Sequence, residues 1–119
     1  LSGCRFNMIT NDFAAQVLSE VLALIRSKPN WSRTVPALKR NVRCCPWAVQ
    51  ADRWSSLGAI ERVLFDRDRY RELLFVTGFI EAEVGFPIQY INYTMSHSRI
   101  VEIFNKTIDK LKDNNNEQM

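Results

Sequence analysis

The chain has 119 residues, of which 46% are hydrophobic and 24% are charged, proportions that are usual for soluble globular proteins. Its formal net charge of +3 is too small to indicate by itself a nucleic-acid or membrane partner. No run of about 18 uninterrupted apolar residues occurs, so the sequence predicts no membrane-spanning helix and we expect no membrane partner.

The positive charge is concentrated in the first half of the chain. Residues 1–50 carry seven Lys or Arg residues against Asp12 and Glu20, a net charge of +5, whereas the remaining residues carry nine against eleven. Any polyanion is therefore expected to bind to the N-terminal half.

Hydrophobic periodicity predicts an all-α fold, a compact single-domain bundle of four main helices. The helices are expected at residues 11–27, 46–65, 67–83 and 97–112, with an irregular loop at 28–45 and an extended loop at 86–95. The single helical domain is expected to span residues 11–112. Residues 1–10 are expected to be an N-terminal leader, with Met8 as an alternative natural start, and residues 113–119 a frayed polar tail.

The first two helices have distinct start signals. Thr10 or Asn11 can cap the first helix, and Pro46 suits the first position of the second. In the second helix Trp47, Trp54 and Gly58 fall on one broad face, so both indoles are expected to point into the core. A glycine inside a helix costs about 1 kcal/mol relative to alanine, so we expect another backbone to approach Gly58 closely.

The third and fourth helices differ in how much of their surface is apolar. The third is apolar over more than half its circumference, which predicts that it is the most enclosed helix, and Asp66 is expected to cap it. Pro87 favours extended geometry at Phe86, which predicts the loop that follows. Ser96 is expected to cap the last helix.

Two segments resemble a known family. "ADRWSSLGAIERV" (51–63) and "SHSRIVEIFNKTIDKL" (96–111) are similar to a family of small bacterial and phage proteins described as a domain of unknown function. The resemblance covers residues 31–112. The positions that match its pattern are Trp31, Trp54, Gly58, Ala59, Asn92, Ser96, His97, Ile100 and Ile108. Ser96 replaces a threonine of that pattern, and Arg99 stands where an acid would complete a capping box. The resemblance implies a helical fold and no particular activity.

The cysteines and the histidine provide the side chains for a zinc site but not the spacing. Cys4, Cys44, Cys45 and His97 would suffice for a Cys3His site. Adjacent thiolates such as those of Cys44 and Cys45 diverge, whereas zinc sites separate paired cysteines by two to four residues. We therefore expect no metal and no cofactor, and free thiols of the kind found in a reducing cytoplasm.

Aromatic residues are interspersed among basic residues between positions 28 and 47, as in single-strand nucleic-acid binders. The basic residues of this stretch are Lys28, Arg33, Lys39, Arg40 and Arg43. The aromatic residues are Trp31 and Trp47, which are equally suited to the core. The sequence has no helix-turn-helix spacing, zinc finger or basic recognition helix, so nucleic-acid binding is an alternative hypothesis.

A catalytic function would depend on His97, because it is the only histidine. In the first turn of a helix the dipole favours the neutral ring, which could act as a base with Glu61 and Asn92 as companions. No nucleophile-elbow or phosphate-loop motif supports this hypothesis. The structural alternative is that His97 bonds to the preceding loop while Glu61 pairs with Arg33 or Arg40.

The leading hypothesis is a non-catalytic bacterial or phage accessory protein that binds another protein or itself. Apolar residues of the 86–95 loop are expected to form an exposed patch of the kind that marks interfaces. These residues are Phe86, Ile88, Tyr90, Ile91 and Tyr93. The alternatives are a nucleic-acid-binding module and an enzyme of unrecognised type that uses His97 and Glu61.

Overall fold

A computed structural model describes residues 10–117, so the expected leader, including Cys4, lies outside the described residues apart from Thr10. Five α-helices lie in the described part of the chain: α2 (Asn11–Ile25), α3 (Ser56–Asp66), α4 (Leu73–Val84), α5 (Ile88–Thr94) and α6 (His97–Glu117). Three short strands and two 3₁₀ turns complete it: β1 (Ala37–Lys39), β2 (Val42–Arg43), β3 (Arg53–Trp54), η1 (Lys28–Asn30) and η2 (Tyr70–Glu72). The domain is mostly helical, and the predicted all-α class is correct only as an approximation because of the small sheet.

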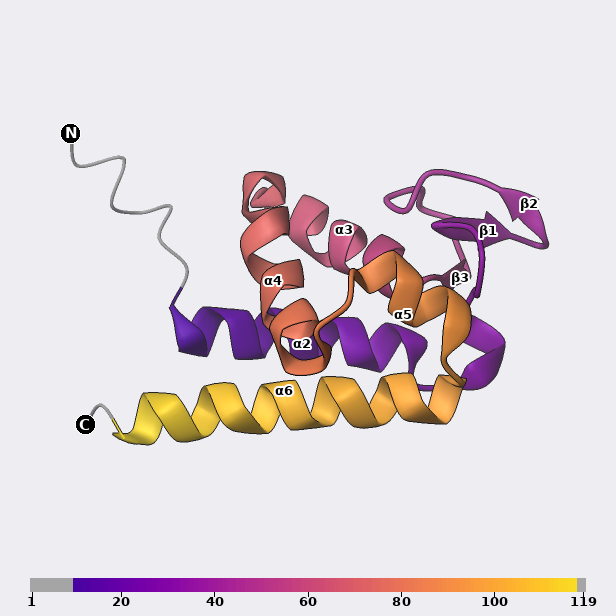
Figure 1. Ribbon diagram of the computed structural model, residues 1–119. Coiled ribbons are helices and arrows are strands. Elements are labelled where there is room, and N and C mark those ends of the chain that lie inside the picture. Colours follow the sequence, from indigo (N-terminus) through magenta and orange to yellow (C-terminus); the bar gives the residue numbers. More distant parts are fainter. Residues whose placement is uncertain (1–9, 118–119) are drawn as a thin grey trace.

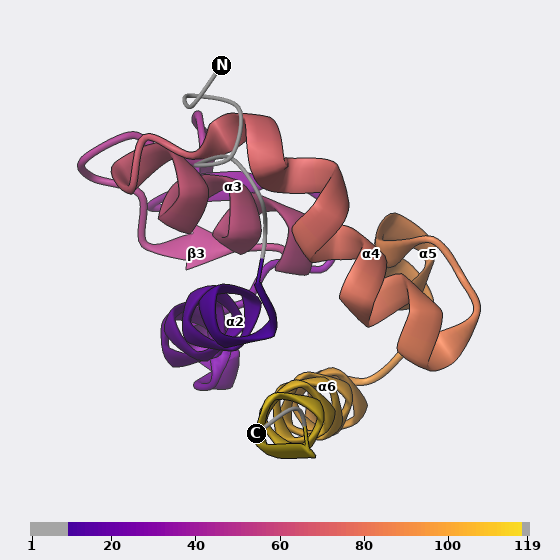
Figure 2. The ribbon, with the colours of Figure 1, turned by 90° about the vertical axis from the view of Figure 1, so that its left-hand side faces the viewer.

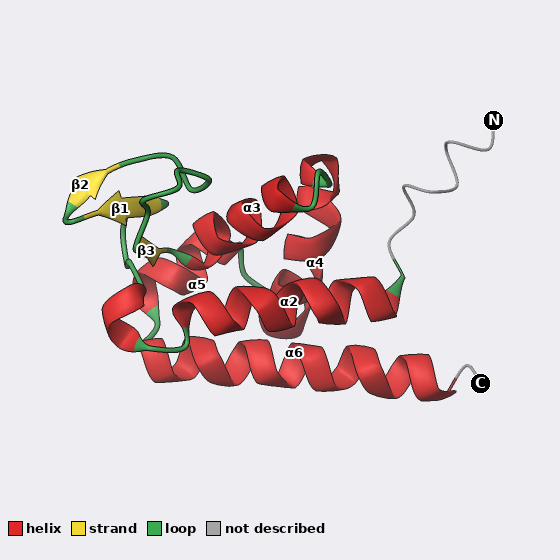
Figure 3. Ribbon diagram, turned by 180° about the vertical axis from the view of Figure 1, so that it is seen from behind, coloured by secondary structure: helices red, strands yellow, loops and turns green. Residues whose placement is uncertain are grey.

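Helices α2 and α6 form an antiparallel pair that carries much of the core (Figures 1 and 3). Figure 2 views the pair almost end-on, with α3 and α4 above it. The larger apolar residues that the pair buries are Val17, Leu18, Val21, Leu22, Ile25, Ile100, Ile103, Phe104, Ile108 and Leu111. Their spacing of three and four residues keeps them on one face of each helix.

Both predicted caps of this pair are confirmed. The Thr10 hydroxyl accepts a hydrogen bond from the Phe13 backbone N–H at 3.0 Å, and the Ser96 hydroxyl accepts one from Arg99 N–H at 3.2 Å. Each satisfies one of the amide groups that a helix start leaves without an intrahelical partner. None of the helices in the described residues is long and apolar enough to cross a bilayer.

The predicted start of the second helix at residue 46 is wrong, because α3 begins ten residues later. The Ser55 hydroxyl accepts a hydrogen bond from Gly58 N–H at 3.0 Å and so caps α3. Residues 46–55 form turns followed by β3, which pairs with β1. The sheet and the Ser55 cap together satisfy backbone groups that a longer helix would have paired internally.

The predicted irregular loop at 28–45 contains two of the strands. The sheet has the order β2-β1-β3, and both pairs are antiparallel, with Leu38 opposite Arg43 on one side and opposite Arg53 on the other. Arg40 and Asn41 join β1 to β2 with φ angles of 49° and 69°. Two successive positive φ angles match the two-residue type I′ turn, whose twist suits a hairpin.

The predicted close approach at Gly58 is confirmed. A Cβ at this position would overlap the carbonyl oxygen of Pro36, which lies just before β1. Gly58 therefore allows α3 to pack directly against the chain that leads into the sheet, and this packing compensates for the cost of a glycine inside the helix.

The expectation that both tryptophans point inward is correct for Trp54 only. Trp54 is buried, and its indole N–H donates to the Pro46 carbonyl at 3.0 Å. Trp47 is 37% exposed. Since residues 46–50 do not belong to a helix, Trp47 does not share the apolar face of α3.

Two further expectations about the second half of the chain are wrong. Asp66 is the last residue of α3, not the cap of the next helix, which follows the turn η2. The 86–95 segment is not extended throughout, because α5 begins directly after Pro87. A proline restricts the residue before it, and the first turn of a helix can follow it without loss of a hydrogen bond.

The last helix is longer than expected. Helix α6 continues to Glu117, through most of the segment 113–119 that was expected to be a frayed tail, while residues 118–119 lie outside the described part.

Candidate functional site

Asn92 of α5 is the most highly connected polar side chain of the interior, with only 3% of its surface exposed. Its Oδ1 accepts hydrogen bonds from the Trp31 indole (2.8 Å) and from the Ser56 N–H (2.9 Å) and hydroxyl (2.8 Å). Its Nδ2 donates to the carbonyls of Ser32 (3.0 Å) and Arg33 (2.7 Å). An amide side chain offers two donors and two acceptor lone pairs, so Asn92 has no capacity left for a substrate.

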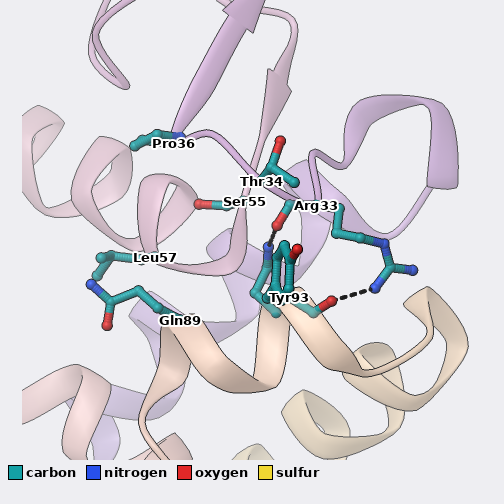
Figure 4. Close-up of a pocket in the computed structure, with 8 residues that line it drawn as sticks. Arg33, Thr34, Pro36, Ser55, Leu57, Gln89 and Tyr93 are labelled. Carbon is teal, nitrogen blue, oxygen red and sulfur yellow. Dashed lines mark hydrogen bonds between the residues drawn. The ribbon is translucent and has the colours of Figure 1, made fainter.

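A pocket of about 400 Å³ lies beside Asn92 and its hydrogen-bond partners, between α5 and the chain around Pro36 (Figure 4). Its lining residues are Arg33, Thr34, Pro36, Ser55, Leu57, Gln89, Asn92 and Tyr93. Figure 4 shows the Arg33 guanidinium turned toward the end of α5, where Nη1 donates to the carbonyls of Tyr93 (2.9 Å) and Met95 (3.0 Å). The lining contains neither a carboxylate nor an imidazole, so it offers no acid–base pair.

The three candidate catalytic residues have separate hydrogen-bond partners. His97 Nε2 lies 2.7 Å from the Ile25 carbonyl at the end of α2, and because a carbonyl only accepts, Nε2 carries the proton. The His97 ring centroid lies 5.4 Å from that of Trp31. No hydrogen bond joins His97, Glu61 and Asn92 to one another among the described residues.

Glu61 does not form the expected ion pair with Arg33 or Arg40. Its carboxylate instead accepts a hydrogen bond from the Tyr70 hydroxyl at 2.7 Å. This hydrogen bond, together with burial and the carboxylate charge, raises the pKa of the Tyr70 phenol above its ordinary value. Glu61 is half-buried, so it is not the fully buried, unpaired carboxylate that would indicate a functional site.

The basic residues of the N-terminal half are divided between two places. Lys39, Arg40 and Arg43 share the hairpin of β1 and β2, where Lys39 Nζ donates to the Gln50 side chain at 2.7 Å. Lys28 lies in η1 and is exposed, while the Arg33 guanidinium lies 4.9 Å above the Trp31 ring. Since Trp31 is buried, its ring is not available to stack on a base.

The cysteines within the described residues are adjacent but differ in exposure. Cys44 is half-buried and Cys45 is exposed. Burial, followed by the negative charges of Cys45 and Asp52, raises the pKa of the Cys44 thiol. In the described part of the chain no three Cys, His, Asp or Glu side chains are grouped closely enough to hold a metal ion.

Large apolar side chains are exposed on α4, on α5 and on the link between them, and the sequence predicted only some of them. Figures 1 and 2 both place α4 and α5 on the same side of the molecule. Large apolar residues of these helices and their link are exposed, and together they are named the α4–α5 face: Leu74, Phe75, Phe86, Tyr90 and Tyr93. The prediction of an exposed patch is correct for Phe86, Tyr90 and Tyr93, whereas Ile88 and Ile91 are buried because they point from α5 into the core.

The prediction that the third helix is the most enclosed is wrong. Leu74 is 82% exposed and Phe75 is 65% exposed, and α4 buries only Val76, Thr77 and Ile80. The sequence carried a signal for an exposed apolar face, since the helix is apolar over more than half its circumference. Such a pattern does not distinguish a helix covered by its own fold from one that a partner covers.

Comparisons of the chain with models of known protein families, with curated proteins and with solved structures found no significant match.

Proposed function

We propose that this protein is a non-catalytic accessory protein that acts by binding through the α4–α5 face, with a second copy of the chain as its partner. The observation that carries the proposal is the exposure of Leu74 and Phe75 on a helix that is apolar over more than half its circumference. Burying a leucine or phenylalanine side chain contributes about 1.5–3 kcal/mol, so leaving both in water forgoes a substantial stabilisation. Adjacent exposed apolar side chains are typical of interaction surfaces.

Gly78 supports close packing of a second helix on this face. It lies four residues after Leu74 and three after Phe75, so the three positions share one side of α4. A Cβ placed at Gly78 would meet no atom within 4 Å, so this side of the helix is open. A partner helix can therefore approach the α4 backbone here more closely than at a larger residue.

Charge favours an antiparallel arrangement of two copies centred on Gly78. In that arrangement residue 71, in η2 just before one α4, lies opposite residue 85, just after the other α4. Arg71 is exposed and forms no ion pair among the described residues. It would lie near the C-terminal end of the second α4, where free carbonyls and the helix dipole favour a positive charge.

Sedimentation velocity over a range of protein concentrations tests this proposal. The wild-type protein is expected to form a dimer whose fraction rises with protein concentration. Leu74→Glu is expected to remain monomeric because it would bury a charge in the interface. Val49→Glu is the matched control, because Val49 is also an exposed aliphatic residue but lies on the turn before β3. A wild-type protein that is monomeric at every concentration would reject self-association.

A further inference from the structure

Three aromatic side chains from separate segments meet at an open pocket at the C-terminal end of α3. Trp47 comes from the turn before β3, Phe65 from the end of α3 and Tyr70 from η2, and with Asp68 they line a volume of about 390 Å³. This volume is within the range of small-molecule sites. All three rings are partly exposed to solvent.

The rings pack on one another in one stacked pair and one edge-on pair. The centroids of Trp47 and Phe65 are 5.1 Å apart with an interplanar angle of 23°, whereas the Tyr70 ring lies 6.0 Å from Trp47 at 85°. Because the face of an aromatic ring carries negative electrostatic potential, the ring surface that stays exposed at the pocket attracts a cation.

Hydrogen bonds fix the backbone on both sides of Trp47 and the hydroxyl of Tyr70 without a ligand. The carbonyls of the two chain neighbours of Trp47 accept hydrogen bonds from Arg62 Nη1 at 3.3 and 3.0 Å. The Tyr70 hydroxyl donates to Glu61 at 2.7 Å. A pocket whose rings are already fixed loses less conformational entropy when a ligand binds.

The charge of the pocket is negative. Asp68 is the only charged residue that lines it, and its carboxylate forms no ion pair among the described residues. Three arginines nearby in the sequence each have a carboxylate partner: Arg62 pairs with Asp66, Arg67 with Glu20 and Arg69 with Glu72. Arg71 forms no such pair and does not line the pocket.

Among the side chains that line the pocket, the Asp68 carboxylate and the Tyr70 hydroxyl are the hydrogen-bond acceptors, and this small number narrows the class of cation. A primary ammonium has three N–H donors and a guanidinium has five, all of which need acceptors, whereas a quaternary ammonium has none. We propose that the Trp47–Phe65–Tyr70 pocket binds a small organic cation of the quaternary alkylammonium class, with the charged group against the rings and Asp68 as its counter-charge. This site shares no residue with the α4–α5 face, so either proposal can fail without the other.

A charged ligand and its neutral isostere test the proposal directly. Choline and 3,3-dimethylbutan-1-ol have nearly the same shape and differ in charge. In NMR titrations of the full chain, choline is expected to shift the Trp47 indole N–H signal and to bind about tenfold more tightly than the alcohol. Trp31 and Trp54 are internal controls, because their indole N–H groups are bonded to Asn92 and Pro46. Equal affinities, or no choline-induced shift at Trp47, would overturn the proposal.

Substitutions in the pocket then identify the side chains that bind choline. Tyr70→Leu removes a ring and is expected to abolish choline binding, whereas Tyr70→Phe keeps the ring but loses its hydrogen bond to Glu61 and is expected to bind choline more weakly than the wild type. Asp68→Asn, which tolerates the same positive φ angle of 58°, is expected to weaken choline binding several-fold and leave the alcohol unaffected. Tyr90→Leu, at an exposed tyrosine of α5, is the control. Wild-type affinity in a folded Tyr70→Leu variant, checked by circular dichroism, would contradict the assignment.

Discussion

The indole N–H of Trp31 donates to the side-chain oxygen of Asn92 at 2.8 Å, a bond between residues 61 positions apart in the chain. Through Asn92 this bond also connects α5 to the start of α3, because the same oxygen accepts hydrogen bonds from Ser56. The node therefore links three segments that the sequence separates widely, and it should contribute to stability rather than to chemistry.

Replacing Asn92 tests this role. Asn92→Ala would leave the Trp31 indole and the Ser56 N–H buried without partners, and each such group costs about 1–3 kcal/mol. We expect a loss of about 3 kcal/mol in the free energy of unfolding, measured by urea denaturation. Asn105→Ala, at an exposed position of α6, is the control and should change stability by no more than about 0.5 kcal/mol. Equal effects of the two substitutions would show that Asn92 is not a structural node.

Alanine at the two glycines within helices should have opposite effects. Gly58→Ala places a Cβ on the Pro36 carbonyl oxygen, and we expect a loss of about 2 kcal/mol because rigid backbone cannot move aside cheaply. Gly78→Ala meets no atom within 4 Å and should stabilise the monomer by about 0.5–1 kcal/mol through helix propensity. Thermal unfolding at low protein concentration measures the stability change of each variant. A stabilised Gly58→Ala would mean that α3 does not pack on Pro36.

The Tyr70–Glu61 hydrogen bond predicts a pH dependence at the alkaline end. Because the folded state raises the Tyr70 pKa above its ordinary value of 10.0, the associated stability is complete below that pH and is lost as the pH rises through the folded-state pKa. Glu61→Gln removes the carboxylate that raises the Tyr70 pKa, so this variant should lose less stability than the wild type over the same alkaline range. Urea midpoints at a series of pH values compare the two proteins, and a stability difference that stays constant across the alkaline range would contradict the prediction.

The adjacent cysteines should differ in reactivity. Burial raises the Cys44 pKa and restricts access to its thiol, whereas Cys45 is exposed. We expect iodoacetamide to modify Cys45 several-fold faster than Cys44, with rates measured by mass spectrometry of proteolytic fragments. In urea the two rates should become equal, because the difference depends on the fold. Faster modification of Cys44 in the folded protein would be inconsistent with this structure.

Sequence patterns predicted the parts of the fold where local signals agree. For α2 and α6, the apolar spacing and the caps Thr10 and Ser96 all point to helices, and Gly58 correctly indicated a close backbone contact. The start of α3 was placed too early because Pro46 resembles a first helical residue, while the true cap at Ser55 carries an equally weak local signal.

The strands and the candidate sites depend on contacts between distant segments. Strands of two or three residues are too short to show an alternating pattern, and the Arg40–Asn41 turn lacks the glycine that usually marks such a hairpin. The aromatic pocket joins Trp47, Phe65 and Tyr70 from three separate segments, so no spacing in the chain could reveal it. The sequence correctly predicted exposed apolar residues at Phe86, Tyr90 and Tyr93 but not at Leu74 and Phe75 of α4.

Disulfide trapping at Gly78 tests most directly the claim that α4 pairs with α4 of a second copy. In a Gly78→Cys variant whose native cysteines are replaced by serine, an antiparallel pair centred on this position brings the two new thiols close enough to bridge. Mild oxidation should then give a covalent dimer on a non-reducing gel, whereas Val49→Cys in the same background should remain monomeric. A Gly78→Cys protein that stays monomeric, or that cross-links no faster than Val49→Cys, would contradict the proposed interface.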